Sequence, residues 1–75
     1  MDKTIKISCE KLEQEVSMKI ENDKYIVKLT VTKNNLIPDQ TGIEICWSYT
    51  DYSNAIEKYI SLAKEQASLI AVLSL

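Results

Sequence analysis

The side chains that could carry out chemistry in this sequence are two cysteines and a scatter of carboxylates. The 75 residues contain no histidine, so neither an imidazole base nor a Ser–His or Cys–His nucleophile pair can form. Cys46 lies between Ile45 and Trp47, and this apolar setting favours an inert thiol, because reactive cysteines need electropositive surroundings. Glu13 and Glu15 are typical of a solvated edge rather than of a catalytic carboxylate pair. We therefore predict a non-enzymatic protein without catalytic residues.

The patterns that hold metals and cofactors are also missing from the sequence. Zinc sites use closely spaced Cys and His ligands, whereas Cys9 and Cys46 are far apart along the chain. Gly42 is the only glycine, so no glycine-rich loop can surround a phosphate group. We expect no metal and no cofactor. The strand pattern places the two cysteines on opposite faces of a sheet, which predicts free thiols and a reducing compartment.

The charge balance argues against nucleic acid and membranes as partners. All nine basic residues are lysines, and the net charge is -2. Arginine, the preferred group for bidentate contacts with phosphate and guanine, is absent. The N-terminal stretch MDKTIKIS lacks the apolar segment of a signal peptide, and the final apolar run is far shorter than the roughly 20 residues that span a bilayer. These features predict a cytoplasmic protein without membrane contact.

Four stretches alternate between apolar and polar residues with a period of two, which is the pattern of half-buried strands. They cover residues 4–9, 15–21, 25–33 and 43–49, and residues 10–14 form a polar connection between the first two. Asn22 and Asp23 predict a tight turn, because both residue types tolerate the left-handed backbone region. Residues 34–42 form the one long loop.

Residues 50–75 have the only helical periodicity in the chain, with Asp51 or Ser53 as the capping residue. The predicted apolar stripe consists of Tyr52, Ile56, Tyr59, Ile60, Ala63, Ala67 and Ile70. The sequence thus predicts a single small α+β domain over residues 1–75, a four-stranded antiparallel meander with a C-terminal helix packed on one face. Trp47 is expected to be largely buried beneath this helix, near Ile56, Ile60 and Ala63. Residues 68–75 could instead form a strand, because a short apolar run does not distinguish the two.

Two apolar stretches point to interaction with other proteins. Leu36 and Ile37 stand beside Pro38 in the long loop, where they either remain exposed or fold back over the core. Six of the last seven residues are apolar and none is charged, which predicts a tail that folds under the sheet or a subunit interface. The predicted partner-binding residues are Asp23, Leu36, Ile37, Asp39 and Glu44. The predicted self-association residues are Leu69, Val72, Leu73 and Leu75, which would form a homodimer.

Two segments resemble the small anti-CRISPR proteins that phages use against type II-A Cas9. They are residues 23–29 (DKYIVKL), a strand entered from a turn, and residues 55–61 (AIEKYIS), a helix start after the sheet. The resemblance covers about a fifth of the chain. Known members block Cas9 by presenting acidic side chains where the target DNA would lie, and Asp23 falls close to such a position. This chain differs from them in having an N-terminal hairpin in place of a helix and in being less acidic.

These observations lead to one preferred function and one alternative. The preferred function is a protein-binding module, encoded by a phage or another mobile element, that inhibits a host protein. The alternative is a small nucleic-acid-associated or regulatory dimer that uses a sheet face rich in lysine and threonine. Loss of DNA binding with rising salt concentration would support the alternative, because phosphate contacts release counterions.

Overall fold

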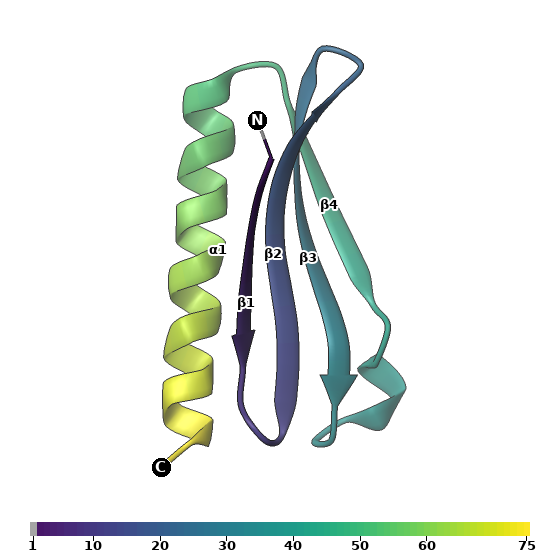
Figure 1. Ribbon diagram of the computed structural model, residues 1–75, viewed down its shortest axis with the longest axis vertical. Coiled ribbons are helices and arrows are strands. Elements are labelled where there is room, and N and C mark those ends of the chain that lie inside the picture. The colour runs from purple at the N-terminus through teal and green to yellow at the C-terminus, as the bar shows by residue number, and fades with distance from the viewer. Residues whose placement is uncertain (1) are drawn as a thin grey trace.

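The computed structural model describes residues 2–75 and confirms the predicted α+β architecture (Figure 1). One antiparallel sheet holds four strands in the order β1-β2-β3-β4, and a single helix follows them. The elements are β1 (Lys3–Ser8), β2 (Leu12–Glu21), β3 (Lys24–Asn34), β4 (Glu44–Tyr49), α1 (Tyr52–Leu73) and a short 3-10 helix, η1 (Pro38–Gln40). Each strand therefore pairs with its neighbour in sequence, as a meander requires.

The turn between β2 and β3 fixes the register of the central hairpin. Asn22 and Asp23 both have positive φ angles, 52° and 63°, as their residue types predict. Such a two-residue turn matches the twist of the flanking strands. It pairs Met18 with Val27 and Val16 with Leu29, so that apolar residues lie opposite one another on the face that the helix covers.

The second strand begins earlier than the sequence pattern predicts. Residues 10–14 were expected to be a polar connection, but β2 starts at Leu12, and Leu12 pairs with Asn34 at the far end of β3. Leu12 and Gln14 are both buried. Side chains alternate along a strand, so Leu12 and Gln14 lie on the same inward face as Val16. The sequence pattern missed them because Gln14 is polar. The connection from β1 is thus a tight turn in which the Cys9 N–H donates to the Leu12 carbonyl, 2.8 Å away.

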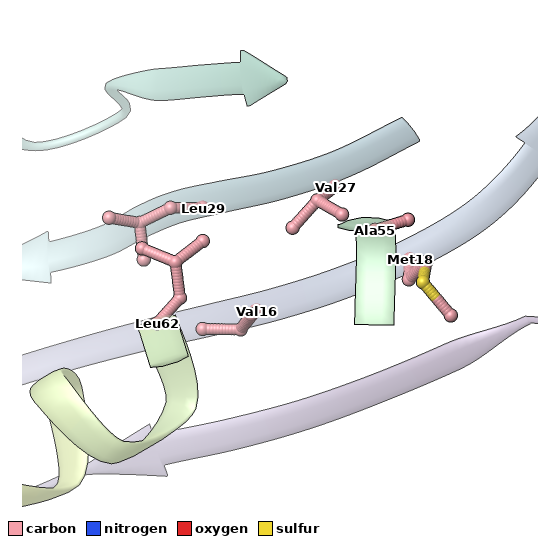
Figure 2. Packing of buried hydrophobic residues seen from close by; sticks show 6 residues of the cluster. All are labelled: Val16, Met18, Val27, Leu29, Ala55 and Leu62. Carbon is pink, nitrogen blue, oxygen red and sulfur yellow. The ribbon is translucent and has the colours of Figure 1, made fainter. Parts of the chain in front are cut away.

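The core lies between the central strands and the helix. Its buried residues are Val16, Met18, Val27, Leu29, Ala55 and Leu62 (Figure 2). Ala55 and Leu62 are seven residues apart, so they lie on the same face of the helix after two turns. Figure 2 shows Leu62 extending from the helix toward Leu29 and Val16. The small Ala55 allows the first part of the helix to approach the sheet closely.

The helix forms where it was predicted, but it is rotated relative to the predicted apolar stripe. Asp51 caps it by accepting a hydrogen bond from the Ser53 N–H at 3.3 Å, and it continues to Leu73, so the alternative of a strand over residues 68–75 is wrong. Leu62, which the stripe omitted, is buried at 4% exposure, whereas Ile60, which the stripe included, is 45% exposed. The narrow helix covers the centre of the sheet, so one edge of the predicted stripe faces solvent.

Trp47 packs against the core and is partly buried, but its neighbour on the helix is not one that the sequence predicts. The Lys58 ammonium lies 4.3 Å from the centre of its ring. Successive helical positions are about 100° apart, so Ile56 and Ile60, two residues to either side of Lys58, point away from Trp47. The predicted contacts with Ile56 and Ile60 are therefore wrong, because the helix presents its other flank to β4.

Removing the Lys58 side chain is expected to expose Trp47, the only tryptophan. Lys58→Ala should shift the native emission to longer wavelength and raise acrylamide quenching, because the lysine stem and ammonium cover the ring. The expected loss of stability is about 0.5–1 kcal/mol, as for an exposed cation–π contact. Lys64→Ala is the matched control, since Lys64 lies on the outer side of the helix. Equal spectra for the wild type and Lys58→Ala would contradict this contact.

Candidate protein-binding surface

An apolar cavity of about 260 Å³ lies where the long loop meets the C-terminal end of the helix. Its lining residues are Leu12, Gln14, Val31, Asn34, Leu36, Ile37, Gln40, Leu69 and Leu73. Leu36 and Ile37 were predicted to bind a partner protein, and Leu69 and Leu73 were predicted to mediate self-association. The fold brings these two pairs together, because the loop after β3 and the end of α1 lie at the same end of the molecule (Figure 1). The two predicted surfaces thus share one cavity.

The loop that forms one side of this cavity is held in place by Asn34. The Asn34 Oδ1 accepts hydrogen bonds from the backbone N–H groups of Leu36 and Ile37, at 3.0 and 2.8 Å. The Asn34 N–H in turn donates to the Thr41 Oγ1 at 3.2 Å, which ties the two ends of the loop together. Asn34 is itself buried, so these bonds are partly shielded from bulk water. The loop therefore presents its apolar side chains in one conformation before any partner binds.

The cavity residues remain half open to solvent. Leu36, Ile37 and Leu69 are 49%, 50% and 43% exposed, respectively. They line the cavity and face solvent at the same time, so the structure combines the two alternatives that the sequence left open for the loop. Ile43, directly before β4, and Ile45, within it, are also exposed. Exposed apolar side chains gathered around one cavity, as Leu36, Ile37 and Leu69 are, are typical of binding sites.

Two glutamine side chains with buried oxygen atoms were not predicted from the sequence. The Oε1 atoms of Gln14 and Gln66 are buried and have no hydrogen-bond partner in the described part of the protein. Gln14 lies two residues before Val16 on β2, and Gln66 lies one turn after Leu62 on α1. Two residues of a strand and one turn of a helix each cover about 6 Å along the molecule. The side chains of Gln14 and Gln66 therefore lie at the same level, next to the contact between Leu62 and Val16. The only sequence feature that indicates their burial is their spacing, two residues from Val16 on the strand and four from Leu62 on the helix.

The remaining predicted interaction residues lie elsewhere. Asp23 is in the β2–β3 turn, at the opposite end of the molecule from the cavity (Figure 1). Asp39 is exposed in η1 next to Ile37, and Glu44 forms an ion pair with Lys28 at 3.6 Å. Val72 and Leu75 are strongly exposed and do not line the apolar cavity. The fold thus gathers only part of the predicted set into one surface.

The outer face of the sheet carries mixed charges. Besides the Lys28–Glu44 pair, the Lys19 Nζ lies 3.0 Å from a carboxylate oxygen of Glu21. This hydrogen bond and the charge of Glu21 raise the pKa of Lys19 above its usual value. Because its carboxylates pair with its lysines, this face does not favour binding to a polyanion.

Within residues 2–75, no three side chains of the His, Cys, Asp or Glu type cluster as a metal ion would require. Cys9 and Cys46 are both free. Cys9 directly follows β1 and Cys46 lies in β4, and these are the two edge strands of the sheet. In the same part of the chain, no helix has the length and apolar character needed to cross a membrane. Comparison with protein-family models, with curated proteins and with solved structures found no match.

Proposed function

We propose that this protein is a non-enzymatic protein-binding module that holds an apolar side chain of its partner in the cavity between the long loop and the helix end. The observation that carries this proposal is the meeting of Leu36 and Ile37 with Leu69 and Leu73 around one open cavity. Binding surfaces of this type combine a few apolar anchors with a polar rim. Here Gln40 and the neighbouring Asp39 supply polar groups beside the mouth.

The energetic argument rests on the exposed apolar side chains and on the rigid loop. Full burial of a large aliphatic side chain contributes about 1.5–3 kcal/mol, so covering the exposed halves of Leu36, Ile37 and Leu69 would contribute about 1 kcal/mol each. The bonds of Asn34 hold the loop in place beforehand, so little conformational entropy is lost on association.

The partner that we propose is a host protein, and the module would act as an inhibitor encoded by a phage or another mobile element. The resemblance to anti-CRISPR proteins makes type II-A Cas9 the first host protein to test. The two segments that carry this resemblance contribute Val27, Leu29 and Ala55 to the shared core. The contacts proposed here are apolar and lie at the end opposite to Asp23, so they differ from the acidic surfaces of known members of that family.

The proposal predicts that a charge at the cavity mouth weakens binding. The tagged protein would be used to capture its partner from host lysate, and the purified partner, with Cas9 as the first candidate, would then be titrated by calorimetry. Ile37→Asp should weaken binding by about tenfold or more, because it loses an apolar contact of about 1 kcal/mol and places a carboxylate against apolar groups, and about 1.4 kcal/mol already changes affinity tenfold. The change should leave stability nearly unaltered, since the side chain is half exposed.

Ile60→Asp is the matched control for this experiment. Ile60 is similarly exposed but points away from the cavity, because it lies nine residues, or half a turn beyond two full turns, from Leu69. Equal affinities for the wild type and Ile37→Asp would contradict the proposed surface, as would a larger loss with Ile60→Asp. DNA binding that weakens steeply with salt, in the absence of a protein partner, would favour the nucleic-acid alternative instead.

A further inference from the structure

Among residues 2–75, no strand pairs with the outer edge of β4, which carries a row of backbone N–H and C=O groups. The Val31 N–H donates to the Ile43 carbonyl at 2.9 Å, which shows that the odd-numbered residues of β3 bond to β4. The register pairs odd-numbered residues with odd-numbered residues along both strands. Backbone groups in an antiparallel strand point alternately to its two neighbours. The N–H and C=O groups that point to the open edge are therefore those of Glu44, Cys46 and Ser48.

This edge lacks the usual protection against pairing with another strand. Natural sheet edges are protected by charges, proline, bulges or a covering element. The sequence of β4, EICWSY, has one charge, Glu44, and that charge is already paired with Lys28. Ile45, on the face that carries the helix, is 46% exposed, so the helix does not cover this edge. The other edge strand, β1, carries two lysines, Lys3 and Lys6.

We propose that a second copy of this chain pairs with β4 in antiparallel orientation, about a two-fold axis at Cys46. With the axis at Cys46, Glu44 of each copy lies opposite Ser48 of the other, and the two Cys46 residues lie opposite each other. All three residues whose backbone groups point to the open edge are then hydrogen-bonded. A shift of the centre to Ile45 or Trp47 leaves one of the three without its partner. The charges also agree with this register, because no carboxylate faces another. If two copies paired through β1 in the same way, about an axis at the middle of the strand, the two Lys6 side chains would lie directly opposite each other, and like charges in that position repel.

The side chains on the helix-bearing face fit the same register. Ile45 of one copy lies opposite Trp47 of the other, and their exposed apolar surfaces cover each other. The two-fold axis is perpendicular to the sheet, so both helices lie on the same side of the joined sheet. The two apolar cavities then lie at opposite ends of the dimer, where each remains open to a partner. The dimer would therefore be bivalent.

Disulfide trapping tests this register directly. Hydrogen-bonded antiparallel partners have Cα atoms about 5.5 Å apart, which lies within the range of about 4.4–6.8 Å that a disulfide spans. Cys9→Ser should form a covalent dimer rapidly and almost completely on oxidation with diamide. A variant with Cys9→Ser, Cys46→Ser and Ser48→Cys has an equally outward thiol on the same strand, but this thiol faces Glu44 of the other copy. It should form far less dimer, and equal rates for the two variants would overturn the register.

The noncovalent dimer is tested by sedimentation of reduced protein. The wild type and Cys46→Ser should be dimers at about 100 µM, whereas Cys46→Pro should be a folded monomer. The proline removes only the N–H that points to the open edge, so the bonds between β3 and β4 remain. A monomeric wild type would overturn the proposal, as would a dimeric Cys46→Pro. Loss of the dimer only in Val72→Glu would place the interface at the helix end. Each result leaves the proposed partner cavity untouched, because Cys46 and Val72 do not line it.

Discussion

Leu62→Ala is expected to lower the free energy of unfolding by about 2–5 kcal/mol, the range measured when a buried leucine is truncated. Leu62 is 4% exposed and packs against the central strands, so its removal leaves a cavity in the core (Figure 2). Ile60→Ala is expected to cost less than about 1 kcal/mol, although the two residues are neighbours on the same helix, because Ile60 is already half in solvent. Denaturation by urea, followed by circular dichroism, measures both values.

The total stability of so small a domain is about 5 kcal/mol, so Leu62→Ala is expected to leave a large fraction of the protein unfolded. Leu62→Met keeps the volume of the side chain and should cost less than about 1.5 kcal/mol, which provides a folded variant for comparison. If Ile60→Ala proved more destabilising than Leu62→Ala, the helix would face the sheet with Ile60 rather than Leu62, as the predicted apolar stripe requires.

The difference between Leu62 and Ile60 shows where sequence reasoning ends in this protein. Period-two alternation fixes which strand residues face inward, and one helix after four strands has only that face to cover, so the fold class is predictable. The helix is apolar over more than half of its circumference, with Ile56 and Ile60 on one side and Leu62 on another. Which side faces the sheet depends on long-range packing, in which the small Ala55 allows close approach and Lys58 covers Trp47.

The candidate site was predictable only in pieces. Leu36 and Ile37 were identified because apolar residues are unusual in a loop, and Leu69 and Leu73 because the helix end is apolar on all sides. Their meeting depends on the length of α1 and on the side chain of Asn34, which folds the loop back toward the helix end. The bonds of Asn34 are local, but the loop and the helix end that meet at the cavity are far apart in sequence, so no local pattern shows their meeting.

Gln14→Leu is expected to raise the free energy of unfolding by about 1–3 kcal/mol. The buried Oε1 of Gln14 has no hydrogen-bond partner among residues 2–75, and an unsatisfied buried polar group costs about that much relative to an apolar side chain of similar volume. Gln40→Leu, at the exposed mouth of the same cavity, is the control and should change stability by less than about 0.5 kcal/mol. A loss of stability in Gln14→Leu would show that its carboxamide has a partner, with Gln66 in the same layer as the first candidate.

The same substitution separates a structural role of Gln14 from a functional one. A residue that weakens the fold and lines a binding cavity is retained when it contributes to function, because stability and activity are then in conflict. Gln14→Leu should therefore bind the captured partner more weakly than the wild type while unfolding at higher urea concentration. A variant that is both more stable and equally tight in binding would remove Gln14 from the site and leave Leu36, Ile37 and Leu69 as its anchors. The opposite changes in stability and affinity are specific to a polar group that contacts the partner, since a purely structural defect alters stability alone.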